Sequence, residues 1–336
     1  MKIENMKRSA GFIKKCAGIL FAGMFLLLLL SGCSAEKQPQ ITVVLDWTPN
    51  TNHTGLYVAQ SLGYFEDRGL NVKIIEPGDN YATQLVASGM AEFGISYQEE
   101  VTFARAAGVP VVSIAALLPH NTSCFAAPAS SGIKSVADFG GKKYGGWGGD
   151  VEQAILDYLL GKAGVKDKVQ VINIGSTDFF AATASKSIDF SWIFYGWTGI
   201  EAEVRNEPLN VIYLTDLDSA LDYYTPVLIS SESFLAENPE LASSFLSAVK
   251  DGYFYASENP QQAAEILLAA VPGLSRPLVE KSQEWMSGRY AEGSFDNWGY
   301  QQKSVWENYT NWLVSNGLLD EAIDVEKAFT TQYLSK

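Results

Sequence analysis

The residues best suited to binding chemistry lie at positions 45–53, which read Leu-Asp-Trp-Thr-Pro-Asn-Thr-Asn-His. The β-branched residues just before them predict a strand that delivers Asp46 and Trp47 to its carboxyl end. An indole face suits a flat ring, and a carboxylate accepts hydrogen bonds from a ring amine. In the alternative interpretation the segment is a turn, with Trp47 in the core and Asn50 or Asn52 capping a helix. Residue types leave both interpretations open.

A second segment, residues 145–150, reads Gly-Gly-Trp-Gly-Gly-Asp between a predicted strand and a predicted helix. Glycines let backbone N–H groups approach an anion or a carbonyl at a helix N-terminus, so Trp147 and Gly148 are candidate ligand contacts. The segment matches neither Walker A nor Gly-x-Gly-x-x-Gly, so no nucleotide site is predicted. A simple tight turn is the alternative.

A third segment, residues 194–201, again places aromatic residues between a strand and a helix. Glu201 lies four residues after Trp197, so the two side chains share a helix face. Tyr195 lies just before them. The alternative is a solvated glutamate beside two packing aromatics.

Predicted strands and helices alternate along most of the chain, which is typical of α/β folds with mostly parallel sheets covered on both faces. From residue 234 onward the chain is mainly helical. We expect a capping box of Asp150 and Gln153 at the start of the helix over 151–162. The predicted strands are 41–45, 72–75, 93–96, 111–117, 143–145, 169–174 and 190–194, and the other predicted helices are 54–68, 82–88, 97–107 and 178–185.

Ligands of open α/β sheets bind beyond the carboxyl ends of the strands. In this chain those ends are rich in aromatic residues, namely Trp47, Tyr81, Tyr97, Trp147, Tyr195 and Trp197. We therefore predict a small-molecule site there.

The N-terminus carries five basic residues, then an apolar run from about residue 16 to 30, then Leu-Ser-Gly-Cys ending at Cys33. This is the pattern of a bacterial lipoprotein signal, with cleavage before Cys33 and a diacylglycerol on its thiol. Acyl chains hold a folded domain at a bilayer, which predicts an extracytoplasmic protein anchored to the cell membrane, on the cell surface or the periplasmic side. An ordinary signal peptide with an incidental cysteine is the alternative. Residues 33–40 are polar and form a short tether.

Charge and composition exclude several classes of function. The whole chain has net charge −14, and without its basic first 32 residues it carries −18. This acidity argues against nucleic acid as a partner. Two histidines and no Cys-x-x-Cys argue against a metal site, and we expect no cofactor. The 304 residues after the signal exceed a single core of about 250–300 residues, so we expect two lobes. We also expect a monomer.

Nucleophilic catalysis has little support. There is no Gly-x-Ser-x-Gly, and Cys124 has only His120 as an obvious partner, so we interpret it as a buried structural thiol. Glu99 and Glu100 are adjacent and would face different directions on a helix.

The segment ending at His53, with its pattern Asp-Trp-Thr-Pro-Asn…His, resembles the substrate-binding lipoproteins of bacterial ABC importers. Within these it is most similar to the group related to thiamin-pyrimidine biosynthesis proteins. Further matching blocks are Gly-Tyr-Phe at 63–65, Gly-Leu at 69–70, Ala-Ser-Gly-Met-Ala-Glu-Phe-Gly-Ile-Ser at 87–96, and Phe…Tyr-Leu at 329–334.

This resemblance implies a two-lobed periplasmic-binding-protein fold of the second type, with one lobe at 41–124 plus 227–336 and the other at 125–226. It implies partnership with an ABC permease and its ATPase, and an aminopyrimidine precursor of thiamin as ligand. Riboflavin or an aliphatic sulfonate, taurine or nitrate-type anion is the alternative. In our hypothesis Trp47 stacks on the ring opposite Tyr195 or Trp197, while Asp46, Asn50 and Glu201 read its polar edge; the remaining predicted contacts are His53, Tyr81, Tyr97, Trp147 and Gly148.

The same superfamily contains an enzyme, the eukaryotic pyrimidine synthase that consumes its own histidine and bound pyridoxal phosphate. In this chain Ser96 stands where that enzyme has its cofactor lysine, and Glu100 where it has its histidine. Residues 223–226 replace its cysteine-rich stretch. Without the lysine no Schiff base forms, so we expect no enzyme.

Overall fold

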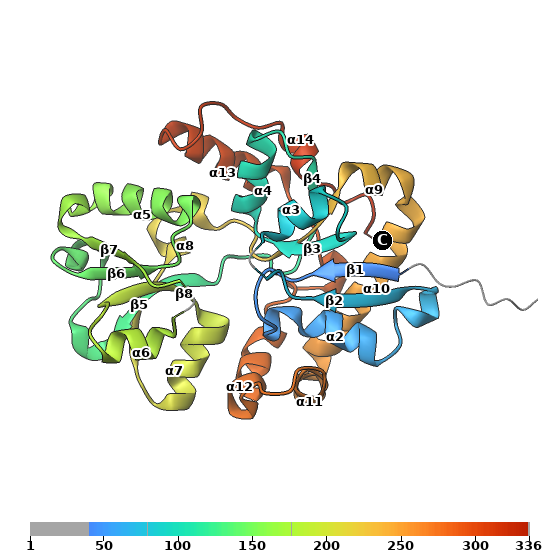
Figure 1. Cartoon of the computed structure of the whole chain (residues 1–336), viewed down its shortest axis with the longest axis horizontal. Coiled ribbons are helices and arrows are strands. Elements are labelled where there is room, and N and C mark those ends of the chain that lie inside the picture. The colour runs from blue at the N-terminus through green and yellow to red at the C-terminus, as the bar shows by residue number, and fades with distance from the viewer. Residues whose placement is uncertain (1–39, 79, 176, 335–336) are drawn as a thin grey trace, which may run out of the picture. The chain divides into compact units, whose positions relative to one another are not determined.

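The computed structural model describes residues 40–78, 80–175 and 177–334 (Figure 1). The predicted signal sequence and the predicted lipidation site Cys33 lie outside these residues. Among the described residues, none of the helices combines the length and the apolar character needed to cross a membrane.

The first sheet has five strands in the order β2-β1-β3-β10-β4. Only β10 runs antiparallel to its neighbours, so the predicted mostly parallel arrangement is confirmed. Its strands are β1 (Gln40–Val44), β2 (Asn71–Ile75), β3 (Phe93–Ser96), β4 (Val111–Ala116) and β10 (Val227–Ser231).

The second sheet repeats this design in the order β7-β6-β8-β5-β9, with β5 as the antiparallel strand. Its strands are β5 (Ser123–Pro128), β6 (Lys143–Gly146), β7 (Gln170–Asn173), β8 (Phe190–Phe194) and β9 (Leu209–Tyr213). In Figure 1 helices lie on both faces of each sheet. The fold is therefore the two-sheet α/β fold of periplasmic binding proteins.

The helices follow the strands along the chain, and the C-terminal third is helical as predicted. They are α2 (Thr54–Ser61), α3 (Ala82–Ala87), α4 (Gln98–Ala106), α5 (Asp150–Lys162), α6 (Phe179–Ala184), α7 (Ile200–Arg205), α8 (Leu214–Leu217), α9 (Glu232–Glu237), α10 (Pro239–Glu258), α11 (Pro260–Ala270), α12 (Arg276–Ser287), α13 (Lys303–Ser315) and α14 (Val325–Ala328).

Two local predictions were wrong. The helix expected over 54–68 ends at Ser61, because Gly63 adopts a left-handed conformation (φ 79°) that stops an α-helix. The capping box expected from Asp150 and Gln153 is absent: the N-cap is Gly149, which has no side chain to cap with, and only its backbone N–H donates to the Glu152 carboxylate (3.3 Å). Glycine precedes the helix because a Cβ at Gly149 would come within 2.7 Å of the Trp147 indole nitrogen.

Each sheet has its own hydrophobic core. Around the first sheet, α2 and α10 cross so closely that a Cβ at Gly252 would overlap the carbonyl oxygen of Gly55. The second sheet packs Phe125, Phe139 and Phe190 together. Helix α13 adds Tyr309, Trp312 and Leu313 to this second core, although the resemblance assigns its segment to the first lobe. The predicted lobe boundaries stay a prediction.

The chain passes between the sheets twice, after β4 and before β10, and the two connections are tied together. The Asn121 side chain donates to the Leu221 carbonyl (2.9 Å), and its backbone N–H donates to Asp222 (3.1 Å). Gln98, the first residue of α4, holds the second connection through hydrogen bonds in both directions with the backbone of Tyr224 (3.0 and 2.9 Å). These contacts fix α4 against the second connection, which is itself bonded to the first.

Candidate functional site

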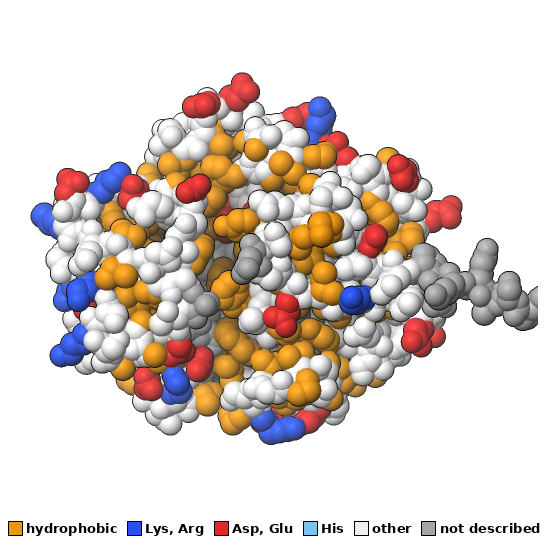
Figure 2. All heavy atoms as spheres, viewed as in Figure 1, with side chains coloured by type: hydrophobic (Ala, Val, Ile, Leu, Met, Phe, Trp, Pro, Cys, Tyr) orange, Lys and Arg blue, Asp and Glu red, His pale blue; other side chains and the backbone are white. Residues whose placement is uncertain are grey.

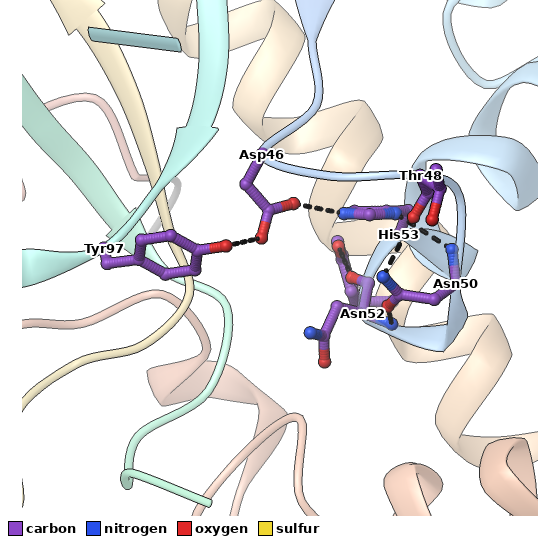
Figure 3. A network of polar contacts seen from close by, with 7 residues as sticks. Asp46, Thr48, Asn50, Asn52, His53 and Tyr97 are labelled. Atoms are coloured by element: carbon purple, nitrogen blue, oxygen red, sulfur yellow. Dashed lines mark hydrogen bonds and ion pairs between the residues drawn. The ribbon is translucent and has the colours of Figure 1, made fainter. Parts of the chain in front are cut away.

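A buried carboxylate lies at the carboxyl end of β1. The Asp46 side chain is only 5 % exposed, and its two oxygens accept from different partners. His53 Nε2 lies 2.6 Å from Oδ1, and the Tyr97 hydroxyl donates to Oδ2 at 2.6 Å. Figure 3 shows the carboxylate between the two rings. Asp46 therefore joins the loop after β1 to the residue that follows β3.

The loop itself sets the orientation of His53. Asn50 caps a short 3-10 helix, Thr51–His53, by accepting from the Asn52 N–H (2.9 Å). The Asn50 N–H in turn donates to His53 Nδ1 (3.1 Å). Since Nδ1 accepts, the ring proton is on Nε2 and points to Asp46. Asn50, predicted as a ligand contact or a cap, acts as a cap in this structure.

Burial alone would raise the pKa of Asp46, but the attraction of His53 and the hydrogen bonds from His53 and Tyr97 lower it below its usual value. Burial and the neighbouring Asp46 carboxylate raise the pKa of Tyr97 well above its usual value. Asp46 is thus ionised at neutral pH, and Tyr97 remains a donor to it.

Two more acids lie at the start of α4, directly after Tyr97. Burial raises the pKa of Glu99 to about 8, and its Oε1 accepts only a long hydrogen bond from Tyr223 (3.4 Å). Burial also raises the pKa of Glu100, which accepts from Ser96 and from Thr83 (3.0 Å). The adjacent carboxyls face different partners, as their spacing predicted.

None of these acids pairs with a lysine or arginine in the part of the chain that the structure describes. The partner of Asp46 is the His53 imidazole, and neither Glu99 nor Glu100 forms an ion pair among these residues. No group of three or more metal-ligating side chains occurs among the same described residues. The carboxyl ends of β1 and β3 are therefore acidic without compensating cations.

Several buried polar side-chain atoms have no hydrogen-bond partner within the described chain. They include Glu99 Oε2 and the Trp192 indole nitrogen on β8. The Tyr309 hydroxyl, whose ring lies 4.7 Å from that of Tyr223, is a third. Buried polar groups in proteins almost always have partners, so these atoms retain hydrogen-bonding capacity for a bound molecule.

Aromatic side chains connect the two sheets at this point. Tyr97 stacks on Phe194, the last residue of β8, with ring centres 6.1 Å apart. Trp147 packs edge-on against Trp192 (5.5 Å). In the space-filling view hydrophobic side chains gather along the hollow in the middle of the molecule (Figure 2). Three predicted contacts keep large exposed fractions, namely Trp47 (51 %), Tyr81 (59 %) and Trp147 (43 %).

The residues predicted from segment 194–201 have other surroundings. The Tyr195 hydroxyl donates to Glu203 (2.8 Å), and its ring lies 5.6 Å from Trp285 on α12. Trp197 packs on a hydrophobic cluster of α2, α11 and α12. Glu201 pairs with Arg205 (3.5 Å). The structure therefore brings Asp46, Asn50, His53 and Tyr97 together, and it places Tyr195, Trp197 and Glu201 elsewhere.

The segment containing Tyr195, Trp197 and Glu201 forms a direct contact between the two halves of the molecule, each half being one sheet with the helices packed on it. Residues Tyr195–Gly199 make a π-helical turn, and the Gly196 carbonyl accepts from Ser282 on α12. Ser282 also contacts the Thr51 hydroxyl (2.6 Å), in the same short helix as His53. Glu203 on α7 pairs with Lys281 (2.7 Å). The loop carrying His53 is therefore linked to the contact between halves.

The backbone N–H groups of the glycine-rich loop bind a side chain of the protein itself, Glu152. Gly148 N–H, a predicted ligand donor, donates to Glu152 Oε2 (2.9 Å), and Glu152 is only 3 % exposed.

Cys124 is buried with its pKa raised to about 12 by burial, while His120 contacts Asp222 (2.8 Å) instead. Cys124 and His120 therefore form no nucleophilic pair.

Comparison with known proteins identifies the family. Residues 50–263 match the model described as NMT1/THI5 like. The chain belongs to the NMT1/THI5-like family. It is 30% identical to a formylaminopyrimidine-binding protein from Halalkalibacterium halodurans, over 94% of this chain and 98% of that one. It is 28% identical to a 4-amino-5-hydroxymethyl-2-methylpyrimidine phosphate synthase from Legionella pneumophila, over 89% and 94% of the two chains.

Among solved structures, the alkanesulfonate-binding protein SsuA from Xanthomonas axonopodis pv. citri, bound to MOPS, superposes with a TM-score of 0.66. The sequence identity is 15%, and the match covers 89% of this chain and 99% of that one. At this identity the likeness concerns the fold. The proteins to which this chain is similar in sequence thus include one named as a binding protein and one named as an enzyme.

Sequence reasoning missed Glu99 and Glu152 as important acids. Glu99 and Glu100 read in sequence as two adjacent helix acids, and only the structure shows that burial raises the pKa of both. Glu152 carries one local signal, since a glutamate at the third position of a helix can accept from the N-cap backbone N–H, as it does from Gly149. Trp192 lies inside the predicted strand over 190–194, and nothing in the local pattern indicates that it packs against Trp147.

Proposed function

We propose that this chain is the ligand-capturing component of an importer and that it binds a planar, amino-substituted heterocycle, most specifically an aminopyrimidine precursor of thiamin. It acts by binding and release, without catalysis. The observation that carries the proposal is the set of buried acids Asp46, Glu99 and Glu100, which have no lysine or arginine partner among the described residues. Donors on the ligand would complete their hydrogen bonding.

The chemistry of an aminopyrimidine suits this arrangement. Its ring edge presents an amino donor beside a ring-nitrogen acceptor. A protonated carboxyl, such as Glu99 with its pKa of about 8, offers an acceptor and a donor in the same spacing. The exposed Trp47 and Trp147 offer faces for stacking, which contributes roughly 1–3 kcal/mol per ring in nucleic-acid systems. The identity to a formylaminopyrimidine-binding protein supports the same class of ligand.

An enzyme of the pyrimidine-synthase type is the weaker alternative. At the position expected to hold its cofactor lysine, the Ser96 hydroxyl donates to Glu100 and is buried. No amine is present there to form a Schiff base. Addition of pyridoxal phosphate to the purified protein should leave its absorbance spectrum without an aldimine band, and appearance of that band would support the enzyme.

A sulfonate, taurine or nitrate-type anion is also a weaker alternative, because the site carries negative charge without cations.

Consistent with the sequence predictions, we place the protein outside the cytoplasm on a lipid at Cys33, as a monomer that delivers its ligand to an ABC permease and its ATPase. These partners remain predictions.

Calorimetry on the domain starting at residue 34 tests the ligand. We expect formylaminopyrimidine or hydroxymethylpyrimidine to bind at least 100-fold more tightly than taurine. The site leaves its carboxyls unpaired with an anion, and such mismatches are worth about 10⁴ in selectivity in favourable cases. Riboflavin is the second ligand to compare. Tight binding of taurine with no pyrimidine binding would contradict the proposal.

The contact between Lys281 and Glu203 gives a further prediction. Both side chains are about two-fifths exposed, so the pair contributes roughly 0.2–1 kcal/mol. Lys281→Glu should weaken ligand binding by a factor of about 2–5, since it places like charges where the two halves meet. The double variant with Glu203→Lys should recover part of this loss in calorimetry. Equal losses in single and double variants would show that the pair does not stabilise the ligand-bound arrangement.

A further inference from the structure

The carboxylate of Glu152 lies inside the loop between β6 and α5, where an external anion would be expected to bind. The backbone N–H of Gly148 (2.9 Å) and of Gly149 (3.3 Å) donate to its Oε2. The N–H of Trp147 (3.3 Å) and the hydroxyl of Tyr144 (2.6 Å) donate to its Oε1. Four donors therefore converge on one carboxylate at the start of a 13-residue helix.

These four donors, from Tyr144, Trp147, Gly148 and Gly149, form an anion-binding site, called the anion seat below, that the Glu152 carboxylate already occupies. Glu152 is 3 % exposed and forms no ion pair with any described residue, so backbone dipoles and one phenol stabilise it. The glycines make room for it, since a Cβ at Gly146 would overlap the carboxylate. Gly148 has φ 86°, which lets the loop turn its N–H groups inward.

We propose that Glu152 is a resident anion and a specificity-determining residue: its carboxylate fills this seat, excludes anionic ligands from it, and holds Trp147 in place beside the ligand. Trp147 follows directly, because its N–H is one of the donors while its indole stays 43 % exposed and packs on Trp192. The part concerning Trp147 rests on the proposed function; the part concerning anions does not.

The test removes the carboxylate from the anion seat and supplies small anions that could take its place. Glu152→Ala removes the carboxylate and leaves its donors free. We expect formate and methanesulfonate, each compared with chloride at equal ionic strength, to raise the Tm of this variant in a saturable way and to leave the wild type unchanged. Glu152→Gln keeps the seat filled by an uncharged side chain, so it should fold and show no such response.

Asp150→Ala is the matched control, because Asp150 is an exposed acid two residues away on the same helix. It should behave as the wild type with every anion. A Glu152→Ala protein that gains nothing from formate or methanesulfonate, or that stays unfolded in both, would overturn the proposal. An equal response of Glu152→Gln would also overturn it, since its seat is not empty.

Calorimetry separates this inference from the proposed function. Formylaminopyrimidine should bind Glu152→Ala at least 10-fold more weakly than wild type, with part of the affinity restored by formate. If wild type binds no aminopyrimidine but the anion responses appear, the proposed function fails and the anion seat stands. If wild type binds the pyrimidine and Glu152→Ala binds it equally well, the role in holding Trp147 is refuted.

Discussion

Replacement of Asp46 by alanine is expected to abolish measurable ligand binding and to destabilise the protein. The buried carboxylate accepts from His53 and from Tyr97, and its removal leaves both donors without a partner. A buried unpartnered group costs roughly 1–3 kcal/mol, so the free energy of unfolding should fall by about 2–6 kcal/mol. Urea unfolding and calorimetry on the same preparation measure both effects.

Asp46→Asn should have a smaller effect than Asp46→Ala. The amide oxygen still accepts from His53 Nε2, and the Tyr97 hydroxyl can rotate to accept from the amide nitrogen. Replacement of the exposed Asp67 by alanine is the control and should change neither measurement. Equal stability of the asparagine and alanine variants, or retained affinity in Asp46→Ala, would show that the Asp46 network does not organise the site.

The second large effect concerns pH and Glu99. Its pKa is raised to about 8 in the folded protein, chiefly by burial, so the folded state holds a proton that the unfolded chain releases near pH 4.5. Its contribution to stability is complete below the unfolded pKa and is lost as pH rises toward 8. One such proton corresponds to roughly 1.4 kcal/mol per pH unit.

Glu99→Gln mimics the protonated acid and removes this dependence. The difference in unfolding free energy between variant and wild type should therefore grow in favour of the variant by about 1 kcal/mol per unit between pH 6 and 8. Urea unfolding at several pH values measures it. Glu237→Gln, at an exposed acid on α9, is the control and should follow the wild type. A pH-independent difference would mean that Glu99 is ionised in the folded protein at neutral pH.

The prediction of elements succeeded where the pattern was local. Strands such as β1 and β8 are short runs of apolar residues bounded by polar ones, and burial between helices requires that composition. Strands β5, β9 and β10 were not predicted. Strand β10 lies between β3 and β4 although more than 100 residues separate it from them in sequence, and no local pattern reports such a partner.

The sequence by itself determined that acids and aromatics follow the strands, and therefore that Asp46, Trp47 and Tyr97 lie at the edge of the first sheet. That follows from strand direction alone. Only the tertiary structure decided which of these groups meet. Tyr195 and Trp197 also follow a strand, but the π-helical turn and the close approach of Gly196 to α12 direct them to the contact between the halves.

The charge state of the site likewise depends on three-dimensional packing. Glu99 and Glu152 read in sequence as ordinary helix acids, and Asp150 is more conspicuous than either. Burial raises the pKa of Glu99, and a loop of glycines closes its N–H groups around Glu152, while Asp150 stays in solvent. Exclusion from water arises from contacts between distant segments, so the sequence names the acids and the fold determines what each can bind.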